Sequence, residues 1–317
     1  VISAEKMNEN FQALVNSNVL RSKSVNCEDG ETINGAIENG YNDITVSGTC
    51  NENLNFVDWN DSPQLAPRYL KLTGADSTAK IVDASGGADS TIFVGAGTTL
   101  SIENLTISGG SYGLAAYRNS NLLLSGVTIE GFTQRGIAIG DSSYLGVNDG
   151  GVTITGGTGS EFGIYFVTGS SAWIHTSDIS NVDQGIVLFG QSYASLHNFT
   201  IDARVYGVRT GRANIETYGD GIKVIQGTSE EAIRILGGSF YSWDGTLEIK
   251  DLQGGKGIRI SEANGVISNL NMPDFDNTGT GWNPAISLDT NSSLALENAV
   301  ISGSTDGALV SISDGSI

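Results

Sequence analysis

The stretch that decides the fold is residues 104–137, which read NLTISGGSYGLAAYRNSNLLLSGVTIEGFTQRGI. Two strings within it, NLTI at 104–107 and GVTI at 126–129, alternate polar and apolar residues as half-buried β-strands do. A glycine followed by an apolar residue comes after each string. The stretch therefore holds one full period of a repeat built from short strands and glycine-rich turns.

A glycine or alanine followed by an apolar residue recurs over most of the chain, and we call this pair of residues the step. The steps are Gly113-Leu114, Gly136-Ile137, Gly163-Ile164, Gly185-Ile186, Gly207-Val208, Ala232-Ile233, Gly257-Ile258, Ala285-Ile286 and Gly307-Ala308. Successive steps are 23, 27, 22, 22, 25, 25, 28 and 22 residues apart. A period in this range is typical of a solenoid, in which each repeat forms one coil.

Two further segments of each period also alternate, so each coil is predicted to contain three short strands. The residue before the third strand is usually Asn or Gly, and both tolerate the positive φ of a tight corner, where stacked Asn amides can bond to one another. These corner residues are Asn104, Gly126, Gly151, Thr176, Asn198 and Asn298. The pattern predicts a three-sided, all-β solenoid of about eleven or twelve coils.

The Gly-Ile steps, the NLTI and GVTI strings and the corner column resemble the pectin-lyase-like right-handed β-helix superfamily. The resemblance covers about residues 25–317 and implies a right-handed parallel β-helix. It implies little about activity, because the superfamily includes lyases, hydrolases, epimerases, phage tailspikes and non-enzymatic surface proteins. Its catalytic strings do not transfer. Trp173-Ile174-His175 lacks the Asp of the pectate lyase string Trp-Ile-Asp-His. Arg259-Ile260-Ser261 lacks the Lys of the polygalacturonase string Arg-Ile-Lys, and there is no Gly-His-Gly.

The two ends of the chain differ from the repeat. Residues 1–24 are predicted to be an N-terminal helical segment or leader, with a helix over 3–16, and residues 25–317 the β-helix domain. SAEKMNENFQAL at 3–14 resembles a leader that precedes β-helix regions in secreted bacterial proteins. A second short helix is expected at about residues 31–38. Unless the chain continues beyond Ile317, the last strand has no predicted cap, and we expect copies to stack head to tail into a filament.

The cysteines and the charge restrict location and partners. Cys27 and Cys50 lie 23 residues apart, about one coil, which predicts a disulfide, with two buried free thiols as the alternative. A disulfide indicates an oxidising compartment, so we expect a secreted or cell-surface protein. The formal charge of −19, from 16 basic and 35 acidic residues, repels nucleic acid and anionic lipid. We also expect no membrane insertion, because no stretch reaches the roughly 18 apolar residues that a spanning helix needs.

The outward position of the Gly-Ile strand carries arginine in three successive coils, at Arg209, Arg234 and Arg259, and Tyr165 two coils earlier. Guanidinium groups stacked ~4.8 Å apart repel one another unless an anion lies between or along them. The column therefore suggests a groove for carboxylate or sulfate groups of an acidic polysaccharide. The alternative is that local carboxylates neutralise the arginines. Those considered are Glu216, Glu231, Glu262 and Asp220.

Two residue pairs are candidates for catalysis. Asp178 and Asp202 lie one coil and one step apart, at about 8 Å, inside the range of inverting glycosidases. His175 and His197 share an outward column and can act as acid and base or ligate a metal. An ordinary solvated surface is the alternative for both pairs. Two ligands do not complete a metal site, so we expect no metal or other cofactor, with Ca²⁺ on the acidic surface as the alternative.

Three functions compete. The first is an extracellular, non-catalytic structural or adhesive protein whose partner is another copy of itself. The second is a carbohydrate-active enzyme, a lyase, hydrolase or epimerase, or a binding module for acidic polysaccharide. The third is ice or mineral surface binding, suggested by an outward column of Thr106, Thr128, Thr153 and Thr200 that Asp178 interrupts.

Overall fold

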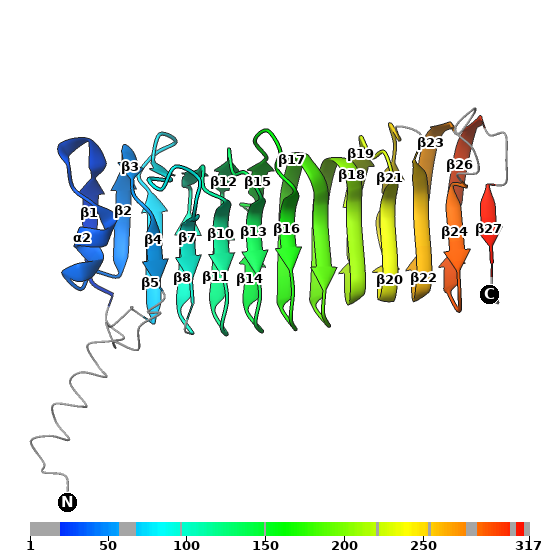
Figure 1. Cartoon of the computed structure of the whole chain (residues 1–317), viewed down its shortest axis with the longest axis horizontal. Helices are drawn as coiled ribbons and strands as arrows, with labels where there is room; N and C mark the ends of the chain where they lie inside the picture. The colour runs from blue at the N-terminus through cyan, green and yellow to red at the C-terminus, as the bar shows by residue number, and fades with distance from the viewer. Residues whose placement is uncertain are drawn as a thin grey trace, which may run out of the picture.

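The computed structural model describes residues 20–56, 68–95, 97–148, 150–219, 222–252, 255–276, 284–304 and 309–313. Within these ranges the strands pair in parallel along one long axis, and the chain winds through about 10 turns (Figure 1). The predicted all-β solenoid is confirmed, and the number of turns is close to the predicted eleven or twelve coils, each about 4.8 Å high.

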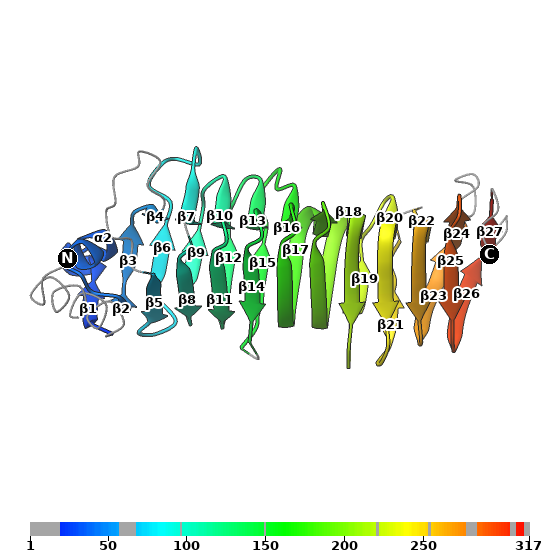
Figure 2. The same cartoon turned by 90° about the horizontal axis from the view of Figure 1, so that it is seen from below.

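Most turns contribute one strand segment to each of three parallel sheets (Figure 2), which we call sheets X, Y and Z in their cyclic order along the chain. Sheet X contains β4 (Leu54–Phe56), β7 (Ser90–Val94), β10 (Tyr112–Ala116), β13 (Arg135–Ile139), β16 (Phe162–Phe166), β24 (Ile286–Asp289) and β27 (Val310–Ile312). Sheet Y contains β1 (Ser22–Asn26), β2 (Asp43–Ser47), β5 (Tyr69–Gly74), β8 (Thr99–Glu103), β11 (Asn121–Ser125), β14 (Tyr144–Val147) and β25 (Ser293–Leu296). Sheet Z contains β3 (Thr49–Asn51), β6 (Lys80–Val82), β9 (Thr106–Ser108), β12 (Val127–Glu130), β15 (Val152–Thr155), β19 (Ile222–Gln226), β21 (Leu247–Ile249), β23 (Leu270–Asp276) and β26 (Ala299–Ser304).

Four strands are long enough to run from one sheet into the next. They are β17 (Ser171–Phe189), β18 (Tyr193–Thr217), β20 (Glu231–Ser242) and β22 (Lys256–Ile267). In β17 the chain turns at Thr176 and Asn181, which have φ of 35° and 56°, so single residues with positive φ make these corners. The hydrogen-bonded ladder therefore continues round the rod with few interruptions.

The Gly-Ile step marks a position where two coils come very close. A Cβ atom at Gly207 would lie 2.3 Å from Cγ2 of Ile225 and 2.7 Å from the backbone oxygen of Ala232, so glycine is needed there. The apolar residues after the step pair in the predicted register from Leu114 onward. The prediction is wrong at the last coil, because Ile286 pairs with Val310 and not with the residue at position 308.

The predicted corner column is confirmed. All six corner residues have positive φ, with values of 51° at Asn104, 63° at Gly126 and 56° at Asn198. The side-chain amides of two stacked corners are hydrogen-bonded, since Asn298 Nδ2 donates to Asn269 Oδ1 at 3.3 Å. Each coil thus turns from sheet Y into sheet Z at the same place.

The core is a set of stacked aliphatic columns inside the three sheets. The inward residues of most strands are buried, as the burial of alternate residues in Asn121–Ser125 shows, whereas Val310 and Ile312 in the last described strand are exposed. Each buried Val, Leu, Ile or Phe contributes roughly 1.5–3 kcal/mol by removing its surface from water. Because the inward positions are fixed in this way, the alternate residues of every strand form an outer face that is free to carry function.

A short helix closes the N-terminal end of the described stack. α2 (Ile33–Glu38) begins after Thr32, whose Oγ1 accepts from Gly35 N at 3.0 Å, and a 3₁₀ turn, η1 (Cys27–Asp29), precedes it. The predicted second helix is confirmed, and its residues Ile33 and Ala36 are buried. The predicted helix over 3–16 lies outside the described residues, so the division at residue 24 stays a prediction. No helix in the described ranges is both long and apolar enough to cross a bilayer.

Candidate functional site

The arginine column lies on the outer face of sheet X in the predicted register. Arg209 pairs with Arg234, and Arg234 pairs with Arg259, so the three side chains come from adjacent coils. Tyr165 lies in the same column, separated from Arg209 by Val187. The structure therefore brings the four predicted binding residues onto one face.

Carboxylates from the chain itself neutralise two of the three arginines. Glu231 is buried and lies between them, with carboxylate oxygens 3.6 Å from Nη1 of Arg234 and 3.6 Å from Nη1 of Arg259. Asp289 Oδ2 accepts from Arg259 Nε at 2.6 Å. Although burial raises the pKa of Asp289, Arg259 holds that pKa below its usual value. The predicted repulsion is thus partly relieved inside the protein.

The prediction that local carboxylates neutralise the arginines is correct for Glu231 and wrong for Glu216. Glu216 lies on sheet Y, where its Oε2 accepts hydrogen bonds from two tyrosines and not from arginine. Asp289 was missed because it comes from the next coil, 30 residues after Arg259, and coil length varies. Asp220 lies outside the described residues.

Arg209 differs from the other two arginines. Nη1 of Arg209 donates to Gln184 Oε1 at 3.4 Å, and its guanidinium lies 5.2 Å from the ring centre of Tyr206 and 5.5 Å from that of Phe189. No carboxylate in the described part of the chain is within ion-pair distance of it. Its Nε is buried without a hydrogen-bond partner there. Arg209 is therefore held by rings and one amide, and no carboxylate among the described residues compensates its charge.

Aromatic rings and a fourth arginine extend this face toward the N-terminus. The guanidinium of Arg135 lies 4.1 Å from the ring centre of Tyr165 and 4.9 Å from that of Tyr112. The rings cover outward residues such as Ala138, which are fully buried as a result. We call these side chains the sheet X stripe: Tyr112, Arg135, Phe162, Tyr165, Phe189, Tyr206, Arg209, Arg234 and Arg259.

The sequence reasoning missed five members of the stripe. These are Tyr112, Arg135, Phe162, Phe189 and Tyr206. Four of them align in one column, three residues before the arginine column, and Phe189 lies two residues after Val187. Following every outward column of the Gly-Ile strand, instead of one, would have found them.

A shallow depression lies at the N-terminal end of the same face. Its volume is about 490 Å³, and Asn53, Phe93, Tyr112 and Gln134 are among its lining residues. The loop beside it is fixed by Asp83, which accepts from Asn53 Nδ2 at 2.7 Å. Although burial raises the pKa of Asp83, hydrogen bonds from Ser85, Asn53 and Gly87 lower it to about 2.

The two histidines stack on the outer face of sheet Y. Their ring centres are 4.5 Å apart and the ring planes differ by 4°. Ring nitrogen lone pairs lie in the ring plane, so those of two face-to-face imidazoles do not converge on one metal ion with bonds of about 2.0–2.1 Å. Burial and, to a lesser extent, the charge of His175 lower the pKa of His197. The predicted neighbours are confirmed, but the geometry fits a stack of rings better than a metal site.

The histidine stack belongs to a larger group of rings that the sequence reasoning missed. The ring centre of Trp173 lies 5.0 Å from that of His197, and Tyr218 stacks on His197 at 5.8 Å. Farther along the sheet, Trp243 stacks on Tyr241 at 5.4 Å. We call these side chains the sheet Y band: Trp173, His175, His197, Tyr218, Tyr241 and Trp243.

Glu216 fixes the tyrosines of this face. Its Oε2 accepts from Tyr218 OH at 2.7 Å and from Tyr193 OH at 3.0 Å. Burial and this carboxylate raise the pKa of Tyr193 to about 12, so its hydroxyl stays a donor at neutral pH.

The comparisons with known proteins agree with this architecture. Residues 85–240 match a family described as "Right handed beta helix region". The chain is a right-handed parallel β-helix. The match supplies the handedness, and it is consistent with the resemblance to the pectin-lyase-like superfamily. No curated protein and no solved structure shows significant similarity to the chain.

The acidic pair of the β-helix lies on sheet Z, away from the arginines. Asp178 pairs with Thr200, and Asp202 pairs with Gln226, so the carboxylates come from neighbouring coils, as expected. Both side chains are exposed. Asp178 also interrupts the threonine column of sheet Z, whose predicted register is confirmed. The two candidate pairs for catalysis and the arginines thus lie on three different faces of the β-helix.

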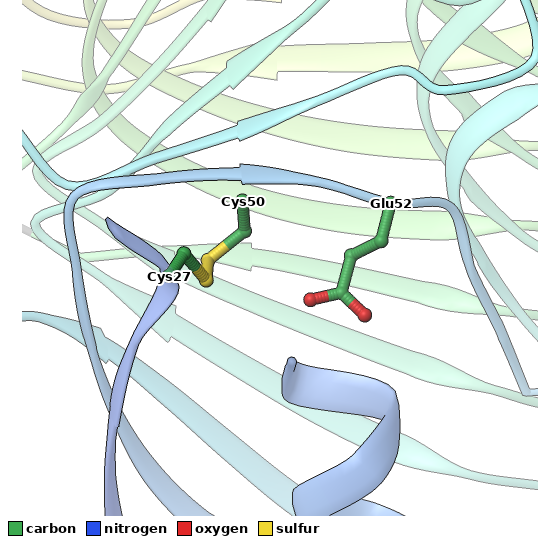
Figure 3. Close-up of side chains that lie close together, drawn as sticks. All are labelled: Cys27, Cys50 and Glu52. Atoms are coloured by element: carbon green, nitrogen blue, oxygen red, sulfur yellow. A yellow bond between two sulfur atoms is a disulfide. The ribbon is translucent and has the colours of Figure 1, made fainter. Parts of the chain in front are cut away.

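The predicted disulfide joins the first two coils of the β-helix. Cys27 and Cys50 are bonded, with Cα atoms 5.1 Å apart (Figure 3). Glu52 lies beside them and completes a group of three potential metal ligands. Its carboxylate, however, accepts from Ile33 N at 2.7 Å and Asn34 N at 3.0 Å, at the start of α2. Because the sulfurs are bonded to each other and the carboxylate caps a helix, this group does not fit a metal ion.

Proposed function

We propose that this β-helix is an extracellular, non-catalytic adhesive protein that binds an acidic polysaccharide along the sheet X stripe. The observation that carries the proposal is the in-register column of Arg209, Arg234 and Arg259 on a chain of formal charge −19. Cations concentrated on one face of an acidic rod direct an anionic polymer to that face and away from the others.

The local charge balance supports an anionic ligand. Lys256 lies opposite Glu231 in the strand register, in the column beside the arginines. This part of the face therefore carries four cations, Arg209, Arg234, Arg259 and Lys256, and two carboxylates, Glu231 and Asp289. Positive charge is thus in excess here. Arg209 offers the least compensated guanidinium, and guanidinium groups bind carboxylates or sulfates through paired hydrogen bonds.

The aromatic members of the stripe hold the arginines in place before a ligand arrives. Tyr206 lies 5.2 Å from the guanidinium of Arg209, and its hydroxyl accepts from Arg234 Nη1 at 2.7 Å. Side chains that are already ordered lose less conformational entropy when a ligand binds. The ring faces of Tyr165 and Tyr112 also offer amphipathic surface beside the charges.

The distribution of polar groups favours binding over cleavage. A polymer lying on sheet X meets neither Asp178 and Asp202 on sheet Z nor His175 and His197 on sheet Y. General acid–base catalysis requires such groups within hydrogen-bond reach of the scissile bond. The pectate lyase and polygalacturonase strings are also missing from the sequence.

Calorimetric titration with polygalacturonate and alginate tests the proposal, with dextran as the uncharged reference. Arg209→Ala should weaken binding of the acidic polymers about tenfold. The matched control is Arg204→Ala, which removes the same charge from a residue paired with Asp183 outside the stripe. Unchanged binding by Arg209→Ala and Arg234→Glu would exclude the stripe as the site.

Incubation with pectin and alginate tests the non-catalytic part of the proposal. Neither unsaturated products, followed by ultraviolet absorbance, nor new reducing ends should appear. Sustained release of either product would support the enzymatic alternative.

Location and self-association are separate parts of the proposal. The Cys27–Cys50 disulfide is compatible with an extracellular protein, and cell fractionation tests this location. Head-to-tail stacking of copies stays a prediction. Electron microscopy of the purified protein should show end-to-end fibres, and discrete particles would contradict it.

A further inference from the structure

We infer that the sheet Y band is a second binding site, independent of sheet X, for an uncharged polysaccharide, with Trp173 and Trp243 as its two contact platforms. The proposal concerns another face of the rod and another class of ligand. It stands or falls separately from the binding of acidic polymers to sheet X.

The two tryptophans that form the platforms are exposed to solvent. Trp173 is 45% exposed and Trp243 is 43% exposed. Apart from Leu20 and side chains from Leu296 onward, they are the exposed large apolar side chains in the part of the chain that is described. Large rings left in water at two points of one face indicate a surface that a ligand covers.

Both tryptophan rings are already held in place by other rings. Trp173 packs against His175 at 5.7 Å and His197 at 5.0 Å. Trp243 lies nearly parallel to Tyr241, with 12° between the ring planes. Rings held by other rings keep a flat face toward solvent and lose little entropy when a sugar ring stacks on them.

The two platforms lie at a spacing that suits a polymer. Strand pairing places Trp243 three coils after Trp173 on the same sheet. At ~4.8 Å between coils, the axial separation is about 14 Å, which a chain of several sugar units can span. His197 and Tyr218 lie between the tryptophans: ring contacts run from Trp173 to Tyr218, and the strand register places Trp243 in the coil after Tyr218.

The charge of this face identifies the ligand class. From the coil of Tyr144 to that of Trp243, Glu216 is the one Asp, Glu, Lys or Arg among the outward residues of sheet Y. These residues are Tyr144, Gly146, Asn148, Ser171, Trp173, His175, Tyr193, Ser195, His197, Asn214, Glu216, Tyr218, Ser239, Tyr241 and Trp243.

An acidic polymer would meet Glu216 on this face without a neighbouring Lys or Arg among those residues. A cationic polymer would find that carboxylate already bonded to Tyr193 and Tyr218. An uncharged polymer is not repelled by Glu216 and does not need its carboxylate as a partner. Its hydroxyl groups can bond to polar side chains such as Asn148 and Asn214, and its ring faces can lie on the aromatic row.

The test is a panel of uncharged polymers, cellulose, xylan, mixed-linkage glucan, starch and galactan, in pull-down and calorimetric assays with the whole chain. Wild-type protein should bind at least one of them saturably. Trp173→Ala and Trp243→Ala should each weaken that binding about tenfold, and Trp173→Phe should keep most of it. Leu20→Ala is the control, because Leu20 is an exposed apolar residue outside the band.

One further variant and one further measurement keep the outcome clear. Arg209→Ala should leave this binding unchanged, which separates sheet Y from sheet X. Thermal unfolding of both tryptophan variants should match the wild type, because their rings are at the surface. Failure of the wild type to bind any polymer in the panel would overturn the inference. So would tryptophan variants that bind as well as the wild type.

Discussion

Sheets X and Y are built from the same coils, yet their outer faces have opposite chemistry. On sheet X, arginines are held by rings and partly compensated by Glu231 and Asp289. On sheet Y, rings stack on rings, and Glu216 is bonded to tyrosine hydroxyls. The difference teaches that each outward column of a solenoid can specialise independently, because the core depends only on the inward residues.

The largest effect is expected where sheet X buries a charge. Glu231→Gln should lower the free energy of unfolding by about 3 kcal/mol, because Arg234 and Arg259 both lose their shared carboxylate. Glu216→Gln on sheet Y should cost about 1 kcal/mol, since it weakens two hydrogen bonds to neutral groups. Urea unfolding measures both changes, and Glu248→Gln, in a surface ion pair with Lys250, is the control. Equal stability of Glu231→Gln and that control would contradict the importance of the buried carboxylate.

Ionic strength should separate the two faces next. Binding of polygalacturonate to sheet X should weaken about tenfold or more between about 0.05 and 0.5 M NaCl, because the salt screens the arginines. Binding of an uncharged glucan to sheet Y should change little over the same range. Calorimetry of each ligand at several salt concentrations provides the measurement. A similar salt dependence for both ligands would remove the distinction between the faces.

A matched pair of tyrosine variants sharpens the comparison further. Tyr206→Phe removes the hydroxyl that accepts from Arg234 at 2.7 Å, and Tyr218→Phe removes the one that donates to Glu216 at 2.7 Å. Each bond involves a charged group, so the loss at buried Tyr206 should cost about 1–2 kcal/mol of stability, and the loss at the more exposed Tyr218 should cost less. We expect Tyr206→Phe to weaken binding only of acidic polymer, and Tyr218→Phe only of uncharged polymer. The opposite pattern would show that the faces have been assigned to the wrong ligands.

The smallest effect should come from His197 on sheet Y. Burial and the nearby His175 lower its pKa in the folded chain below the ordinary value of 6.5. The unfolded chain therefore takes up the proton first, and stability is fully present above pH 6.5 and declines as the pH falls toward the lowered pKa. The loss should be under about 1 kcal/mol. Comparing urea midpoints of the wild type and His197→Gln at pH 7.5 and 5.0 isolates it, and an identical pH dependence of the two proteins would count against it.

The sequence by itself determined the architecture, because the repeat places residues about two dozen apart side by side. Gly207 and Ile137 mark where coils approach and where the core lies, and Asn104 marks a corner. The same period aligned Arg234 with Arg259 and Cys27 with Cys50. These features depend on backbone register, and the backbone register follows from residue type and spacing.

Only the tertiary structure decided what each outward side chain touches. Coil lengths vary, so the pairing of Asp289 with Arg259 and of Ile286 with Val310 was not apparent from the period. Long side chains also reach beyond their own column, as Arg135 does when it covers Tyr165. The charge that remains on sheet X and the rings that gather on sheet Y depend on these contacts, since a repeat fixes where a side chain starts but not where it ends.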